Sequence, residues 1–353
     1  MELKNKLKNT FTPKLRKFTK HPYFKFIMFG IALFILQSLS ATGVMQFSFG
    51  LALTQTMIYS IVAVGFSYLL GYAGLASLGT AGFVGLGAYT VSIFLRNYTS
   101  VPYLVVLLIV LLISLIIGII VGFISLRIEG LFLAIVTLGL SEVLYQVFLN
   151  GGVLTGGPNG TNLRGYPNIF GLQLDRTMTM YMVLIFLIAL LIVTYNLINS
   201  PTGRAMLAMK NSTSAAQAMG ISLMKYRLLA FVLSTMYAGL AGALFMSFVR
   251  YTDPYSYSIM FSLNILAACI FGGTRNLWGV MAGTLLVFGL VPMFLQDVTF
   301  LRTNSWLFNV IIGGLLILIV LFYKGGVVQL FTNIKYRFKK SVERARVKKY
   351  GYD

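Results

Sequence analysis

Cysteine and histidine are nearly absent from this chain of 353 residues. It has one cysteine, Cys269, and one histidine, His21. A lone cysteine excludes an internal disulfide, and a lone histidine leaves no cluster for a histidine-rich metal site. We therefore expect no metal site in this protein and no catalytic residue at either position.

Acidic residues are also scarce. The chain has 8 Asp and Glu against 28 Lys and Arg, and 10% of its residues are charged whereas 58% are hydrophobic. About a quarter of the residues in a soluble domain are charged. This composition therefore excludes a soluble domain and indicates a polytopic membrane protein. Positions 1–25 hold 8 of the basic residues and positions 324–353 hold 9. Such tails are typical of segments that bind anionic membrane lipid at the cytoplasmic face, and they do not indicate a nucleic-acid partner.

The dipeptide Gly-Lys, which a Walker A motif requires, does not occur in the chain. The glycine-rich segment TGGPNG at 155–160 has no such lysine either. The chain therefore lacks an ATP site of this kind, and we expect no bound cofactor. If its function uses ATP, a separate polypeptide must hydrolyse it.

Long apolar runs are what the chain has in abundance. Most of them reach the roughly 20 residues that a helix needs to cross a bilayer. They lie near residues 26–42, 50–70, 75–95, 102–126, 131–149, 178–198, 228–249, 257–273, 277–295 and 305–323. The third and eighth are short or interrupted by glycine, so each either spans the membrane or re-enters on one side. The sequence thus predicts an all-α protein of about ten transmembrane or re-entrant helices, with its membrane domain at 26–323.

The distribution of basic residues predicts which side each loop faces. With both termini in the cytoplasm and ten crossings, 23 basic residues lie inside and 5 outside, as the positive-inside rule requires. The polar loop 199–227 then faces the cytoplasm. The loop 150–177, rich in Gly, Pro and Asn, faces outward as a lid or docking surface.

The loop 199–227 is the longest polar stretch between apolar runs. Pro201 is typical of a first helical turn, Ser212 or Ser214 of a helix N-cap, and Gly220 of a left-handed helix end. This pattern predicts two short helices. The loop is interpreted either as a plain connection or as a docking surface for a cytosolic protein.

Glycine is concentrated in GYAGLASLGTAGFVGLGAYT at residues 71–90. Small residues let helices pack closely, and a break in a helix is tolerated in the bilayer only where it is buried or lines a cavity. The stretch therefore fits either tight helix packing or a broken helix beside a translocation pathway.

Glu142 is the one ionisable residue that lies well inside an apolar run. Glu142, Gln146 and Asn150 are spaced by four and so share one helix face. A carboxylate there can receive a substrate ammonium, pair with an arginine, or meet polar groups of a partner subunit. The other candidates for lining a pathway are Ser77, Thr80 and Thr137.

Several segments occur in an order that resembles a known family. They are GYAGLASLGTAGFVGLGAYT, LRIEGLFLAIVTLGLSEVL, TGGPNG, SPTGRAMLAMKNSTSAAQAMGI with AFVLSTMYAGLAGALF, and GGTRNLWGVMAG. Over residues 45–325 the chain resembles the LivM-type permeases of branched-chain amino-acid ABC transporters. The resemblance implies a bacterial inner-membrane subunit that is not itself an enzyme. It also implies three kinds of partner: a LivH-type second permease, two cytosolic ATPases and an extracytoplasmic substrate-binding protein.

The resemblance sharpens the interpretation of the polar loop. Import permeases carry a Glu-Ala-Ala triplet followed after three residues by Gly, and this segment docks into a groove on the ATPase. Here Ser214, Ala215, Ala216 and Gly220 match that spacing, with serine in place of the acid. The predicted coupling loop also includes Gly203 and Arg204.

The substrate is the least determined part of the resemblance. It implies uptake of branched-chain or similar small hydrophobic amino acids by alternating access. The chain departs from the family at Thr80, Val280 and Arg275, where members often carry His, Pro and Gly. A related branch imports urea or short amides. The alternative from another class is a stand-alone secondary carrier, with Glu142 as its coupling site.

Overall fold

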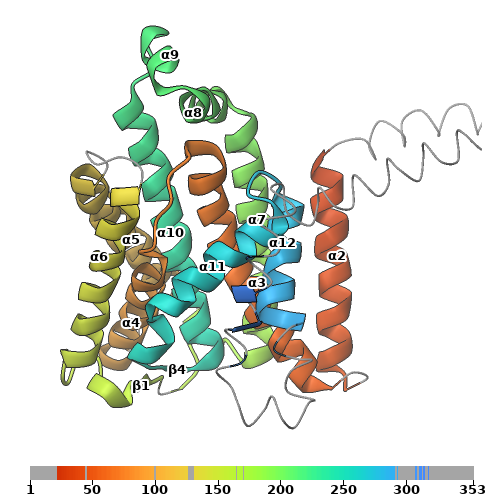
Figure 1. Cartoon of the computed structure of the whole chain (residues 1–353). Helices are drawn as coiled ribbons and strands as arrows, with labels where there is room; N and C mark the ends of the chain where they lie inside the picture. The colour runs from red at the N-terminus through yellow and green to blue at the C-terminus, as the bar shows by residue number, and fades with distance from the viewer. Residues whose placement is uncertain are drawn as a thin grey trace, which may run out of the picture.

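The computed structural model describes residues 22–290, apart from 44–45, 99–100, 126–130, 164 and 170, together with isolated positions between 292 and 317. This part of the chain is largely helical, as expected for an all-α protein (Figure 1). The basic tails up to residue 21 and beyond 323, and most of the tenth apolar run, lie outside the described residues.

Six described helices are long and apolar enough to cross a bilayer. A helix satisfies its own backbone groups in hydrocarbon, so long apolar runs take this form. The six are α2 (Pro22–Ala41), α3 (Phe47–Ser67), α5 (Tyr103–Ser125), α6 (Leu131–Asn150), α7 (Arg176–Asn199) and α10 (Leu223–Val249). Each of them coincides with a predicted run.

The other apolar helices in the described part of the chain are shorter. They are α4 (Thr80–Asn97), α11 (Ile259–Gly272) and α12 (Leu277–Thr284), which continues as the π-helix η4 (Leu285–Leu290). The 14 residues of α11 extend about 21 Å at 1.5 Å per residue, less than the roughly 30 Å of a hydrocarbon core. The sequence predicts that the runs 75–95 and 257–273 are short or interrupted by glycine. Both contain one of these shorter helices, α4 in the first and α11 in the second.

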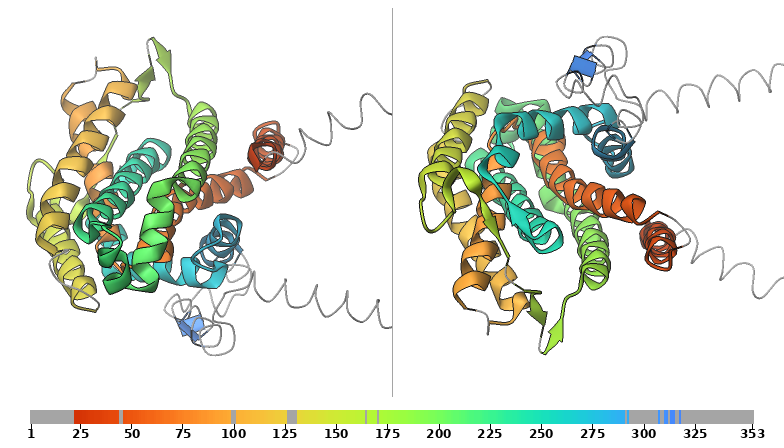
Figure 2. Two further views of the ribbon diagram at one scale, coloured as in Figure 1. Left: turned by 90° about the horizontal axis from the view of Figure 1, so that it is seen from above. Right: turned by 90° about the horizontal axis from the view of Figure 1, so that it is seen from below.

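The centre of the bundle is formed by α3, α4 and α10 (Figure 2). α4 and α10 pack with their backbones in contact. A Cβ atom on Gly87 would overlap the carbonyl of Gly239, and one on Gly242 would overlap the carbonyl of Val84. Tight packing is therefore confirmed as one reason for the glycines within 71–90. Around this centre, α5 and α6 cover one side and α2 lies at the opposite edge against α3 and α7.

The two ends of the bundle differ in structure (Figure 1). At one end, α8 (Pro201–Asn211) and α9 (Thr213–Ala218) connect α7 to α10, and we call this the α8–α9 end. At the other, which we call the strand end, lie the 3-10 helices η2 (Gly157–Asn159) and η3 (Pro254–Tyr257) and two small antiparallel strand pairs. They are β1 (Thr161–Asn162) with β4 (Tyr251–Thr252), and β2 (Asn168–Ile169) with β3 (Leu172–Gln173).

The strand end contains most of the loop 150–177, which the sequence predicts to be rich in turns. Six of its glycines have positive φ, which is the left-handed backbone that such turns use. The strands within it have two residues each, too short to produce the alternating pattern by which a strand is recognised in a sequence.

Basic residues are unevenly divided between the two ends. The described ones at the α8–α9 end are Lys25, Arg204, Lys210, Lys225, Arg227 and Arg275. The strand end has Arg96, Arg176 and Arg250 together with two acids, Asp175 and Asp253. This division agrees with a cytoplasmic α8–α9 end, and the sidedness itself stays a prediction.

Candidate functional site

A break in the helical backbone separates α3 from α4. α3 continues as the π-helix η1 (Tyr68–Ala73) and ends at Gly74, which has φ +73°. Residues 75–79 are not helical, and α4 starts at Thr80. The run predicted at 75–95 is therefore a linker followed by a helix. Gly74 permits the left-handed turn that ends η1, because glycine has no Cβ atom and adopts a positive φ without strain.

Hydroxyl groups from two other helices hold this break in place. The backbone N–H of Leu78 donates to Thr137 Oγ1 at 3.0 Å, and that of Gly82 donates to Ser141 Oγ at 3.1 Å. The N–H of Ala81 donates to Ser262 Oγ at 2.9 Å. The first N–H groups of a helix have no partner within it, so the bonds to Ser262 and Ser141 satisfy two of those of α4 inside the bundle. The predicted lining residue Thr137 thus contacts the linker.

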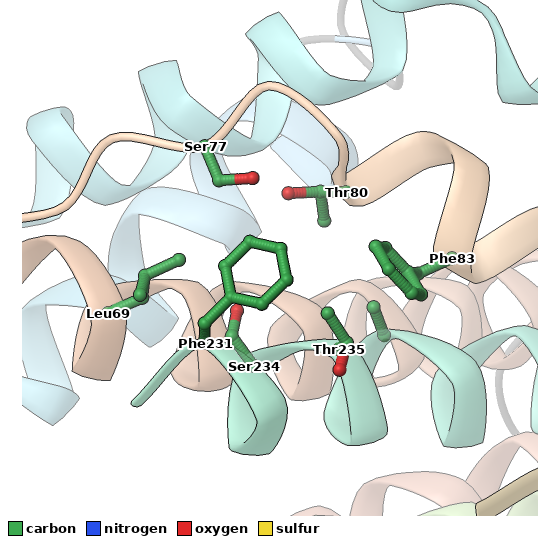
Figure 3. A pocket seen from close by; sticks show the side chains of 8 residues that line it. Leu69, Ser77, Thr80, Phe83, Phe231, Ser234 and Thr235 are labelled. Atoms are coloured by element: carbon green, nitrogen blue, oxygen red, sulfur yellow. The ribbon is translucent and has the colours of Figure 1, made fainter. Parts of the chain in front are cut away.

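A small pocket lies beside the break (Figure 3). Ser77 and Thr80 reach into it from the linker and from the start of α4, opposite Phe231, Ser234 and Thr235 of α10. The remaining lining residues are Leu69, Phe83 and Ala238. Its volume of about 10 Å3 is close to the least that holds a water molecule. In this conformation no amino acid fits there.

The predicted polar face of α6 is present as a ladder of hydrogen bonds. Gln146 Nε2 donates to Glu142 Oε1 at 3.0 Å, and Asn150 Nδ2 donates to Gln146 Oε1 at 3.2 Å. All three side chains are exposed on the outer face of α6, whereas Thr137 and Ser141 are buried on its inner face. The structure therefore does not bring Glu142 together with Ser77 and Thr80. Among the described residues, no arginine or lysine forms an ion pair with Glu142.

The loop 199–227 forms the two short helices that its sequence predicts. Pro201 begins α8, and Ser212 caps α9 by accepting a hydrogen bond from the N–H of Ala215 at 3.3 Å. Gly220 has φ +78°, the predicted left-handed end. Ser212, and not Ser214, is therefore the capping residue.

The predicted coupling residues differ in exposure. Gly203 and Ala216 are buried, and a Cβ on Gly203 would overlap the Ile198 carbonyl. The exposed ones are Arg204, Ser214, Ala215 and Gly220. α9 thus presents small side chains to solvent, and the next residue, Met219, is 83% exposed.

Lys210 joins this loop to the broken helix. Its Nζ donates to the carbonyls of Leu70 and Gly71 in η1, both at 2.8 Å. Its aliphatic stem lies so near Gly74 that a Cβ there would approach Lys210 Cγ to 3.0 Å. Partial burial, and to a smaller extent Arg275, lowers the pKa of Lys210. α8 is therefore bonded to the backbone immediately before the break.

Metal ligands are not grouped in this part of the molecule. Within the residues that the structure describes, no three His, Cys, Asp or Glu side chains come together to hold an ion. Cys269 is buried in α11, where its thiol donates to the Ala63 carbonyl at 3.4 Å.

Comparison with known proteins identifies the family to which this chain belongs. The family described as the branched-chain amino acid transport system permease component matches residues 48–320. This chain belongs to that permease family. With six helices able to cross a bilayer, the permease is a multi-pass protein of the bacterial cell membrane.

Relatives of the permease carry names with different substrates. The high-affinity branched-chain amino acid permease protein LivM of Salmonella typhimurium is 31% identical over 66% of this chain and 60% of its own length. The autoinducer 2 import permease protein LsrC of an Enterobacter species is 28% identical over 73% of each chain. The ribose import permease protein RbsC of Haemophilus influenzae is 26% identical over 76% of this chain and 81% of its own. The chain thus spans about 60% of the LivM relative. No solved structure matches the permease.

Two parts of this site are not among the residues predicted from the sequence. Ser234 and Thr235 are adjacent hydroxyl residues within an apolar run of the permease, and this pair is the one local signal for the pocket. In the sequence, Lys210 is one basic residue among several in the loop 199–227. Its bond to Leu70 crosses 140 residues of sequence, and no local pattern predicts such a contact.

Proposed function

We propose that this permease is the membrane subunit of an ATP-driven importer of branched-chain or similar small hydrophobic amino acids. Its partners are a LivH-type second permease, two cytosolic ATPases and an extracytoplasmic substrate-binding protein. The observation that carries the proposal is the bond between α8 and the broken helix through Lys210. A stand-alone carrier has no need for such a link to an exposed cytoplasmic loop.

The ATPase docks on α9 and the turn that follows it. The small exposed side chains of Ser214 and Ala215 allow close approach of a groove. Met219 supplies an apolar anchor, because a large hydrophobic side chain that is 83% exposed gains most from burial in a partner. Ala216 is buried within the loop and fixes the shape of this surface.

Movement of α8 passes through Lys210 to the linker. The two carbonyls that Lys210 holds belong to the last turn of η1, and the linker begins three residues after Gly71. A displacement of α8 therefore moves Ser77 and Thr80 relative to Phe231. Opening of the pocket of Figure 3 is how the permease would alternate between its closed and open forms.

Glu142 is the second candidate for the substrate path. It lies on an outer face of α6, where an uncompensated carboxylate in contact with lipid is unfavourable. A second permease covering this face would turn the ladder of Glu142, Gln146 and Asn150 into the wall of a shared path. The carboxylate would then receive the ammonium group of an amino acid.

The docking surface is tested by co-purification of the full-length permease with its ATPases. We expect Met219→Asp, Ala216→Asp and Gly220→Pro to abolish both ATPase recovery and uptake of labelled leucine while membrane insertion is unchanged. Ser222→Asp is the matched control, since Ser222 is also exposed and lies three residues from Met219. Normal uptake in all three variants would overturn the coupling assignment.

The substrate is tested separately by uptake competition in cells. Excess leucine, isoleucine or valine should each suppress uptake of labelled leucine through this permease, whereas urea, ribose and autoinducer 2 should not. Suppression by urea alone, or by ribose alone, would retain the importer and replace its substrate.

A further inference from the structure

A second and larger pocket, which shares no lining residue with the first, opens at the α8–α9 end. Its volume is about 390 Å3, and it lies between the start of α2, the end of α7, the π-helix η1 and the turn from α11 to α12. Lys25, Tyr72, Asn199 and Arg275 contribute the polar part of its wall, and Phe26 and Trp278 contribute much of the apolar part. The transport scheme above gives this pocket no role.

The pocket is positively charged and has no acidic neighbour among the described residues. Both of its cations, Lys25 and Arg275, are exposed. The structure describes three acidic residues, and all lie elsewhere: Asp175 and Asp253 at the strand end, and Glu142 on the outer face of α6. The wall therefore attracts an anion.

Arg275 is held in place by its backbone. Tyr72 Oη donates to the Arg275 carbonyl at 3.0 Å. The Asn276 side chain accepts from the N–H groups of Trp278 and Gly279 at 3.0 and 3.4 Å, which caps α12. The tight turn between α11 and α12 thus fixes the backbone from which the Arg275 side chain extends. A guanidinium group with several donors is well suited to the oxygens of a phosphate.

Aromatic rings form another part of the pocket wall, which we call the aromatic wall. Phe26 stacks on Trp278 with ring centroids 5.1 Å apart, and Tyr195 meets Phe26 edge-on at 5.5 Å. Trp278 remains 36% exposed. Aromatic side chains that are partly buried and partly exposed to water are typical of the membrane interface. α2 continues from this wall with exposed apolar side chains, among them Ile27, Ile31 and Phe34.

We infer that this pocket binds the headgroup of an anionic phospholipid. Arg275 and Lys25 contact the phosphate, the Asn199 amide offers a further hydrogen bond, and the acyl chains lie along the apolar face of α2. The pocket, with its aromatic wall and the apolar face of α2 beside it, suits a lipid better than free phosphate. Basic pockets between helices at the cytoplasmic side are typical sites for such lipids.

The test is native mass spectrometry of the full-length permease released from nanodiscs that contain equal amounts of phosphatidylglycerol and phosphatidylcholine. We expect at least one phosphatidylglycerol to remain bound, and the double variant Lys25→Gln with Arg275→Gln to lose it with a drop of several-fold in occupancy. The double variant Arg204→Gln with Lys225→Gln is the charge-matched control, since both residues are exposed on the same end of the bundle and neither lines the pocket. Lipid held by the other basic residues of the two tails contributes equally to all variants.

A second variant separates binding from folding. Arg275→Lys keeps the charge, so it should retain the phosphatidylglycerol that Arg275→Gln loses, at an unchanged melting temperature. Equal retention in the Lys25 and Arg275 double variant and in the Arg204 and Lys225 control would overturn the inference. Displacement of the lipid by millimolar inorganic phosphate would also overturn it, because the site would then be one for free phosphate.

Discussion

Gly87 is a position where a single methyl group decides the packing of two helices. A Cβ there would overlap the backbone carbonyl of Gly239, which cannot rotate away as a side chain does. We expect Gly87→Ala to lower the free energy of unfolding by about 1–3 kcal/mol, as overpacking typically does. Thermal unfolding in detergent measures this. Gly139→Ala is the control, because no atom lies within 4 Å of its added Cβ, and an equal loss of stability in both variants would contradict the argument.

Glu142 allows charge to be separated from hydrogen bonding. Glu142→Gln keeps an oxygen that can accept from Gln146, as Glu142 Oε1 does at 3.0 Å, and removes the negative charge. If the carboxylate binds the substrate ammonium, uptake should fall about tenfold or more, since hydrogen bonds to charged groups contribute roughly 1.5–3 kcal/mol. Transport assays in proteoliposomes measure this, with Val143→Ala as the neighbouring exposed control. Unchanged uptake with intact assembly would assign Glu142 a structural role.

At this scale the sequence predicts which residues share a face, and little more. The spacing of Glu142, Gln146 and Asn150 correctly predicts their common face, because helix geometry is local. The direction of that face depends on how α6 packs against α4, which no spacing contains. Thr137 lies on the face of α6 that packs inward, where it accepts a hydrogen bond from the N–H of Leu78. The spacing of residues along α6 does not predict this contact either.

The linker of residues 74–79 is the element on which the coupling proposal depends. We expect Lys210→Met to leave the complex assembled and to lower the amount of substrate imported per ATP hydrolysed, because the bonds to Leu70 and Gly71 are lost while the apolar stem remains. Parallel uptake and ATPase assays in proteoliposomes give this ratio. Lys210→Arg, which can still donate to both carbonyls, should restore most of it.

An unchanged ratio in Lys210→Met would show that movement reaches the linker by another route. Loss of ATPase recovery in the same variant would instead make Lys210 part of the docking surface. Lys225→Met is the control for Lys210→Met. It removes an exposed charge from the same end of the bundle and leaves the hydrogen bonds between Lys210 and η1 in place.

Elements were predicted well where their causes are local. Apolar length predicts the six long helices, and Pro201, Ser212 and Gly220 predict the two helices of the coupling loop. The break at Gly74 was one of two interpretations of a glycine-rich stretch, because glycine serves both close packing and turns. Its exact place depends on hydroxyls from α6 and α11, which are distant in the sequence.

The orientation of the whole molecule can be measured with cysteine labelling, because the chain has a single cysteine and it is buried. We expect a membrane-impermeant maleimide to label Val153→Cys in intact spheroplasts, and Met219→Cys only after permeabilisation. Both sites are well exposed, Val153 by 87% and Met219 by 83%. The unmodified chain should stay unlabelled throughout. The reverse pattern would place the α8–α9 end outside and exclude ATPase docking there.

α10 connects the two ends of this molecule without interruption. Its 27 residues run from Leu223 to Val249, after which β4 pairs with β1 of the loop 150–177. At 1.5 Å per residue the helix is about 40 Å long, so it joins the proposed ATPase surface at α9 rigidly to the strand end. Thermodynamic linkage is reciprocal. If the proposed ATPase docks on α9 and the proposed binding protein docks on the loop 150–177, the free energy that one of them transmits to the other along α10 must equal the free energy transmitted in return.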